Sequence, residues 1–215
     1  NYKQSVEVAN ETAINTLLDG CKYDLTRRRV LEDLTVLGIG ATKTTFNWSE
    51  GAKVEYVDPA NLVYSYTDSP YFDDIYYVGE VKHLPINEVA KEFPHLSESQ
   101  LEEIRSKNNN AAGHHISDSD KNKVSILYFN YKTFMNDVYK VKKSKSGAEK
   151  SIPKDDSFMP PAGASDYSKL QRTVECLFEG ALVLGTDILL KWKKADNMMR
   201  TKSDFNKVKM NYSIV

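Results

Sequence analysis

Apolar residues recur with a helical period along the N-terminal part of the chain. Residues 1–19 mix apolar and polar positions in a pattern compatible with a helix that Gly20 ends. Residues 23–37 show the period more clearly, and Gly38 follows where a left-handed glycine cap would close the helix. The apolar positions on one face of this second helix are Val30, Leu31, Leu34 and Leu37. We therefore predict two N-terminal helices, the second packing its apolar face on a sheet.

After Gly40, apolar positions alternate with polar ones, which is the pattern of half-buried strands. Residues 42–48 and 54–58 indicate two strands joined by a short glycine-containing turn. Pro59 is expected to end the second strand, because proline has no N–H group for a β-ladder. Two further strands are predicted within residues 61–66 and 74–84.

The C-terminal half of the chain predicts more strands. Residues 123–134 and 137–143 suggest a β-hairpin that turns around 135–137. Three further strands are predicted within residues 172–180, 181–194 and 207–215.

Two short helices and two long loops interrupt the strands. The first helix starts near Pro85, and Ser97 and Gln100 have capping-box spacing at the start of the second. Residues 108–122 and 144–166 have too few apolar residues to offset the entropy lost on ordering, so we expect exposed, mobile loops. The prediction is one α+β domain over residues 1–215, with N-terminal helices followed by a mostly antiparallel β-sheet, two short helices and two long loops.

Composition narrows the classes of function. The 215 residues are 40% hydrophobic and 27% charged, which is typical of a globular protein. The net charge of -1 shows no basic surplus of the kind that nucleic-acid binders carry, and we interpret the basic runs at 27–29 and 140–145 as solvated faces. No apolar run approaches the ~20 residues of a membrane span, so no membrane partner is predicted. Thirteen tyrosines indicate half-wet strands and contact surfaces.

The residues that could carry chemistry form no recognisable active site. Glycines 38 and 40 follow a helix and precede a strand, the reverse of the order in a dinucleotide-binding loop. Adjacent histidines such as His114 and His115 rarely bind one metal ion, because neighbouring side chains point apart. Cys176 lies in a predicted strand, where a core thiol is expected. We predict no catalytic residue, no cofactor and no metal.

An aromatic and basic platform for single-stranded nucleic acid is a second candidate. Tyr76, Tyr77 and Trp192 would supply the rings, and lysines flank Trp192. We favour the alternative that the aromatic rings fill a core and that the lysines protect a sheet edge.

Taken in order, four segments resemble the portal proteins of tailed bacteriophages, most closely those of podovirus and crAss-like type. The segments are "DLTVLGIGATKTTFN", "VEYVDPANLVYS", "YFDDIYYVGEVKHLPINEVAKEF" and "GALVLGTDILLKWKKADNMMR". The likeness rests on Gly38, Gly40, Asp58, Pro59, Phe72, Asp73, Asp74, Gly79, Glu80, Glu88, Gly185, Thr186, Asp187, Asn197 and Arg200. It covers most of the chain outside the two loops.

The resemblance implies a structural, non-enzymatic role in the virion, after assembly in the host cytoplasm. Portal subunits form a homo-oligomeric, typically dodecameric ring at one capsid vertex, through which DNA passes without sequence-specific binding. Their partners are the major capsid protein, the packaging terminase and the neck or tail adaptor. The chain corresponds best to the wing region, so we expect it to be a fragment, with stem, clip and crown outside it.

Two alternatives stay open. The chain could belong to another neck or baseplate adaptor built on a similar β-rich framework. It could also be a metal-dependent nuclease that uses Asp68, Asp73, Asp74 and His83.

Overall fold

The protein was analysed as a computed structural model. It describes residues 2–47, 49, 51–111, 123–144, 147–160, 163, 167–196, 198–200 and 203–215, with the side chains of 2–3, 47 and 107–111 left out. The helices are α1 (Tyr2–Gly20), α2 (Tyr23–Val36), η1 (Pro59–Asn61), α3 (Ile86–Glu92) and α4 (Glu98–Ala111). The strands are β1 (Ala41–Asn47), β2 (Gly51–Val57), β3 (Leu62–Tyr64), β4 (Tyr77–Pro85), β5 (Lys123–Lys143), β6 (Glu149–Lys154), β7 (Tyr167–Val183), β8 (Leu189–Lys194) and β9 (Tyr212–Ile214).

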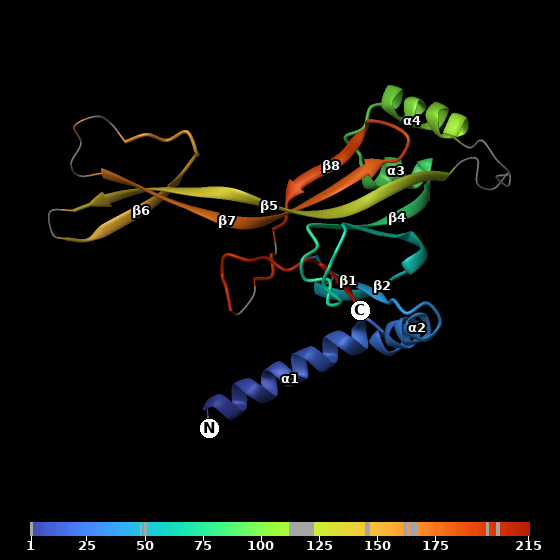
Figure 1. Ribbon diagram of the computed structural model, residues 1–215, viewed down its shortest axis with the longest axis horizontal. Coiled ribbons are helices and arrows are strands. Elements are labelled where there is room, and N and C mark those ends of the chain that lie inside the picture. Colours follow the sequence, from blue (N-terminus) through green and yellow to red (C-terminus); the bar gives the residue numbers. More distant parts are fainter. Residues whose placement is uncertain are drawn as a thin grey trace.

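These elements form two antiparallel sheets. The smaller has the order β2-β1-β9, and the larger has the order β3-β4-β5-β7-β8 with β6 paired to the outer part of β5. Figure 1 shows β5 and β7 crossing the whole larger sheet and continuing beyond it, while α1 and α2 lie on the far side of the smaller sheet. The predicted α+β class, helical first and mostly antiparallel afterwards, is confirmed.

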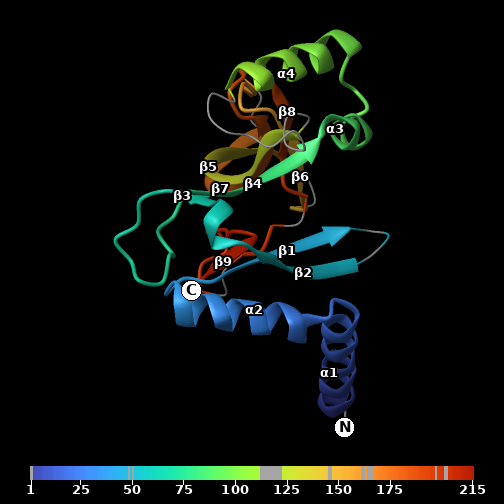
Figure 2. The same ribbon diagram turned by 90° about the vertical axis from the view of Figure 1, so that its right-hand side faces the viewer.

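Two apolar clusters hold the fold together. The first joins the two sheets and contains Val57 and Ile214 from the smaller sheet with Val78 and Leu177 from the larger. The second packs α3 and α4 on the other end of the larger sheet, with Val89 and Ile104 against β5, β7 and β8. Figure 2 shows both helices at the end of the larger sheet away from the smaller one.

Local sequence signals fixed several boundaries as predicted. Gly38 has a φ of 77° directly after α2, the left-handed conformation expected of a glycine cap. The Ser97 backbone N–H donates to Gln100 Oε1 at 3.0 Å, and the Gln100 N–H donates back to Ser97 Oγ, as in a capping box. The predicted short turn between β1 and β2 is confirmed by their antiparallel pairing.

The predicted hairpin around 135–137 is wrong, because β5 runs unbroken from Lys123 to Lys143. The polar residues at this point are satisfied across the strands rather than in a turn. Asn136 Oδ1 accepts a hydrogen bond from Thr173 Oγ1 at 2.9 Å, and Asp137 lies 3.6 Å from Arg172. The strand break predicted near residue 180 is likewise wrong, since β7 continues to Val183.

The two predicted loops are only partly loops. Helix α4 continues to Ala111, and residues 112–122 lie outside the described part of the chain. Within 144–166, residues 149–154 form β6, which pairs with β5 and has all six residues exposed. The β5 strand is long enough to offer this segment an open edge, so a polar sequence can join the sheet without being buried.

The predicted apolar face of α2 is also only partly used. Val30 and Leu34 pack against the entry to β1, where a Cβ at Gly40 would lie 2.9 Å from Val30 Cγ1. Leu31 and Leu37 are exposed, and no described residue of α2 is buried. None of the helices in the described ranges has both the length and the apolar character needed to cross a membrane.

Candidate functional site

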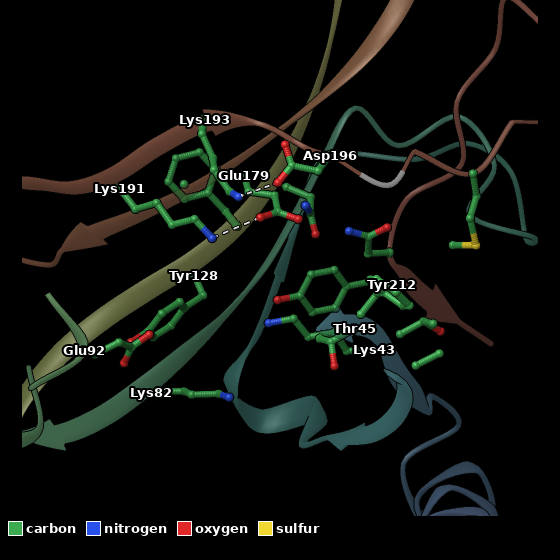
Figure 3. A pocket seen from close by; sticks show the side chains of 18 of the residues that line it. Lys43, Thr45, Lys82, Glu92, Tyr128, Glu179, Lys191, Lys193, Asp196 and Tyr212 are labelled. Atoms are coloured by element: carbon green, nitrogen blue, oxygen red, sulfur yellow. Dashed lines mark hydrogen bonds and ion pairs between the residues drawn. The ribbon is translucent and has the colours of Figure 1, made fainter. Parts of the chain in front are cut away.

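A cavity of about 760 Å³ lies between the two sheets (Figure 3). Its walls come mainly from β1, β4, β5, β7 and β8, and residues of β2, α3, β9 and the segment between β8 and β9 complete its lining. Glu80 and Glu179 lie two residues after the core residues Val78 and Leu177 and share their strand faces, so the sheet geometry turns both carboxylates towards the smaller sheet.

An ion pair crosses this space from sheet to sheet. Lys43 Nζ on β1 lies 2.8 Å from Glu80 Oε1 on β4, and Lys82 Nζ approaches the same oxygen at 3.2 Å. The Glu80 side chain is only 8% exposed, whereas that of Lys82 is 45% exposed. Lys43 is therefore the partner that compensates the buried charge of Glu80.

Two tyrosines surround this pair. Lys43 Nζ lies 5.1 Å from the ring centre of Tyr212 and 5.8 Å from that of Tyr128, within range of cation–π attraction. Figure 3 shows Lys43 and Tyr212 directed into the same part of the cavity. Burial raises the pKa of Tyr212, and the nearby Glu80 carboxylate raises it further. Burial likewise raises the pKa of Tyr128, whose hydroxyl donates to Glu92 at 2.7 Å.

A second set of ion pairs lies on the opposite wall. Lys191 Nζ on β8 lies 3.0 Å from Glu179 Oε2, and Lys193 Nζ lies 2.8 Å from Asp196 Oδ2. The hydrogen bond between the last two lowers the pKa of Asp196 and raises the pKa of Lys193.

The charges around the cavity therefore compensate one another. Four lysines face four carboxylates, counting Glu80, which holds Lys43 and Lys82. Within the described residues, no group of three His, Cys, Asp or Glu side chains is placed to hold a metal ion. Of these pairs only Lys43–Glu80 joins the two sheets, and we call it the polar seam.

Sequence reasoning missed this seam. Lys43 and Glu80 are far apart along the chain, and no motif links them. The available signal was that Lys43 and Glu80 each lie two residues after a core residue, Ala41 and Val78, and so share its strand face.

The acidic residues of the predicted nuclease alternative serve the loop between β3 and β4. The Asp74 carboxylate accepts hydrogen bonds from the Thr67 hydroxyl and from the Asp68 backbone N–H, and both lower its pKa. Asp68 accepts a hydrogen bond from Tyr66 at 2.6 Å. The His83 side chain is hydrogen-bonded to Ser125 near the other end of β4. This position is about 20 Å from the start of the strand at ~3.3 Å per residue. The structure does not bring His83 to the aspartates.

Several other residues of the resemblance occupy turns or closely paired strands. The Asp58 carboxylate accepts the Ala60 N–H and starts η1, whose first residue is Pro59. Gly79 lies so close to β5 that a Cβ there would come within 2.5 Å of the Tyr128 carbonyl oxygen.

Three further residues of the resemblance lie in the turn between β7 and β8 or in the segment between β8 and β9. Gly185 and Asp187 lie between β7 and β8, and Gly185 has a φ of 80°. Arg200 donates to the Phe205 carbonyl at 2.8 Å. Asn197, His114 and His115 lie outside the described residues. Cys176 is buried in β7, as predicted.

An aromatic cluster covers the opposite face of the larger sheet. Trp192 stacks on Phe178 with ring centres 5.1 Å apart, and Phe129 and Tyr131 lie 5.9 and 6.3 Å from it. Tyr76 extends the cluster through its edge contacts with Tyr77 and Tyr131. We call these six residues the aromatic face.

The single-strand platform, which the sequence did not favour, is only partly assembled around Trp192, because Lys194 shares the strand face of Trp192 but Lys191 and Lys193 do not. Lys191 and Lys193 alternate with Trp192 along β8, so their ammonium groups reach into the cavity while the ring joins the aromatic face. As expected, β8 is an edge strand. The favoured expectation that the aromatic rings fill a core is wrong for Trp192 and Tyr76, which are 47% and 53% exposed.

No protein-family model matches the chain, and no curated protein shows significant similarity to it.

Proposed function

We propose that this chain is part of a phage portal protein, a non-enzymatic subunit of the ring through which DNA enters and leaves the capsid. The observation that carries the proposal is the aromatic face. Trp192 and Tyr76 are 47% and 53% exposed although both belong to a connected aromatic cluster. Aromatic side chains are enriched where one protein surface covers another.

The N-terminal helices support an assembly role in the same way. Helix α1 makes its main contacts with α2 and β2, and Figure 1 shows it leading away from both sheets. Val8 and Ile14 on α1 and Leu31 on α2 are at least half exposed. Most of a helix's stability in a protein comes from packing an apolar face, so these helices are suited to a neighbouring subunit.

The order of motifs then favours a portal over another neck or adaptor protein. The helix, glycine cap, paired strands, Asp-Pro turn and acidic loop follow one another as the resemblance implies. The geometry gives no comparable support to a nuclease, because His83 does not lie beside Asp68, Asp73 and Asp74.

Electron microscopy of the full-length protein that contains this chain tests the proposal. We expect negatively stained particles to be closed rings with a central channel. A Trp192→Glu variant should assemble less well, because a charge would replace the exposed ring. Met159→Glu, which adds the same charge at an apolar side chain that is 83% exposed and lies away from the aromatic face, serves as the control.

Both variants are checked for native circular dichroism before imaging. Particles without a channel, or a protein that stays monomeric at all concentrations, would exclude a portal. Rings that form equally well with Trp192→Glu would remove the aromatic face from the assembly surface.

A further inference from the structure

Beyond the body of the larger sheet, β5, β6 and β7 form a three-stranded ribbon. We call it the arm and define it as residues 136–160 and 167–173. Neither neighbour covers it, since β4 pairs with β5 only as far as Tyr131 and β8 pairs with β7 only from Phe178 onward. Figure 1 shows the arm projecting from the rest of the molecule.

The strand register gathers five lysines on one face of the arm. Lys140 and Lys142 alternate on β5 and share a face. Lys169 lies directly opposite Lys140, and Lys150 lies directly opposite Lys142. Lys154 lies opposite Val138 and completes the set, which we call the lysine face.

This arrangement costs stability in the isolated chain. Like charges directly opposite each other in an antiparallel pair are destabilising, and the lysine face contains two such pairs. Among the residues that the structure describes, none of the five ammonium groups forms an ion pair with a carboxylate. A polyanion bound to this face would relieve the repulsion.

The other face of the same ribbon has no such excess. Lys143 lies 3.3 Å from Glu149, and Arg172 lies 3.6 Å from Asp137. In total the described residues of the arm carry seven basic and four acidic side chains, in a chain whose net charge is -1. Asp156 lies beside the lysine face, where its carbonyl accepts a hydrogen bond from Lys169 Nζ at 3.2 Å and its carboxylate accepts one from Asn136 at 3.4 Å. The remaining excess of positive charge is concentrated on one side of one projecting element.

The aromatic ring at this face is occupied. Lys140 Nζ lies 3.8 Å from the ring centre of Tyr167, and Lys142 Nζ lies 5.6 Å from it. Base stacking on an aromatic ring needs a free ring surface. The chemistry offered is contact with phosphates rather than stacking of single-stranded bases.

We propose that the lysine face binds the phosphate backbone of double-stranded DNA without reading its sequence. Duplex DNA carries one negative charge per ~1.7 Å of its axis, so several lysines on one face can contact neighbouring phosphates. The net charge of the whole chain conceals this surface. The inference does not rest on the portal proposal, because the chain alone, without ring formation, should show the binding.

Fluorescence anisotropy with a labelled random-sequence duplex of about 20 base pairs tests it on the 215-residue chain. With five phosphate contacts, affinity should fall about 500-fold between roughly 50 and 200 mM salt. Lys140→Gln combined with Lys142→Gln should lower the logarithmic salt slope by about 1.8. The matched control, Lys143→Gln with Arg172→Gln, removes the same charge from the other face and should change the slope by less than about 0.5.

The pair Lys150→Gln and Lys154→Gln, on the exposed β6, repeats the test if the first variant fails to fold. An equal loss in the control, or no binding at about 50 mM salt, overturns the proposal. Tighter binding of a single strand than of the duplex also overturns it. Self-association of the chain that the lysine variants abolish would identify a second copy as the partner instead of DNA.

Discussion

Lys43 on β1 and Glu80 on β4 form an ion pair that joins the two sheets, with 2.8 Å between Nζ and Oε1. Their side chains are only 17% and 8% exposed. Each charge therefore compensates the other for the water that burial removed. Removing one partner alone should be costly to stability, because the other would stay buried and unpaired.

We expect Glu80→Gln to lower the free energy of unfolding by about 3 kcal/mol, because Lys43 would be left buried without its counter-charge. Lys82→Gln is the control, since the more exposed Lys82 also approaches Glu80 and its loss should cost less than about 1 kcal/mol. Urea denaturation followed by circular dichroism measures both. Similar losses in the two variants would mean that Lys43 is not the main partner of Glu80.

Removal of the Tyr212 hydroxyl should affect stability differently from removal of the hydroxyl of its neighbour Tyr128. Tyr212 is 4% exposed, and within the described part of the chain its hydroxyl has no hydrogen-bond partner, although the Glu80 carboxylate lies near enough to raise its pKa. Tyr212→Phe should leave the unfolding free energy within about 0.5 kcal/mol of the original, because a buried unsatisfied hydroxyl contributes nothing that its removal forfeits. Tyr128→Phe should cost about 1 kcal/mol by losing the bond to Glu92. Thermal and urea unfolding compare the two, and a larger loss at Tyr212 would contradict the assignment.

The elements predicted correctly were those with a local signal. Gly38, the Ser97 capping box and the β1–β2 turn each place a particular residue type at a backbone position that needs it. The fold class followed from these signals together with the change of apolar period after Gly40.

The errors arose where a distant segment decided the outcome. Asn136 and Asp137 have turn-like polarity, but β7 supplies Thr173 and Arg172 as partners and keeps β5 straight. For the same reason, neither of the two functional candidates was identified from the sequence. The Lys43–Glu80 seam and the lysine face exist only through pairings of strands that are far apart in sequence.

The apolar face of helix α2 has a packed part and an exposed part, and two substitutions can distinguish them. Leu34 packs where β1 begins, whereas Leu31 is 50% exposed. We expect Leu34→Ala to lower the unfolding free energy by about 2 kcal/mol and Leu31→Ala by less than about 0.5 kcal/mol in the isolated chain. Urea midpoints of the two variants give the comparison. A cost at Leu31 equal to that at Leu34 would show that this face is covered within the chain.

Gly79 should tolerate no side chain. A Cβ at this position would lie 2.5 Å from the Tyr128 carbonyl oxygen, which is backbone held in the β5 ladder and cannot move aside alone. Gly79→Ala is expected to lower the unfolding free energy by about 3 kcal/mol through overpacking. Gly20→Ala is the control, since nothing lies within 4 Å of a Cβ there. Thermal unfolding measures both, and an unchanged midpoint for Gly79→Ala would contradict the close approach of β4 to β5 at this position.

The contact between Tyr56 on β2 and Asp33 on α2 should make stability depend on alkaline pH. Burial and the 2.6 Å hydrogen bond to the Asp33 carboxylate raise the pKa of Tyr56 from 10.0 to about 12. Between these values the folded chain keeps a proton that the unfolded chain has lost, so stability falls as pH rises from about 10 to 12. Below about pH 10 the contribution is present in full.

The measurement is the urea midpoint of the original chain and of Tyr56→Phe at several pH values from about 8 to 12. Tyr128 and Tyr212 also have raised pKa values, so only the difference between the two chains isolates Tyr56. That difference should be constant up to about pH 10 and then shrink, because only the original chain has this proton to lose. Asp33→Asn removes the charge beside the hydroxyl and lowers the folded-state pKa of Tyr56 towards its ordinary value, so the decline should still begin at about pH 10 but become smaller and end at a lower pH. A difference that stays constant to pH 12 would mean that α2 is not held to β2 through this hydroxyl.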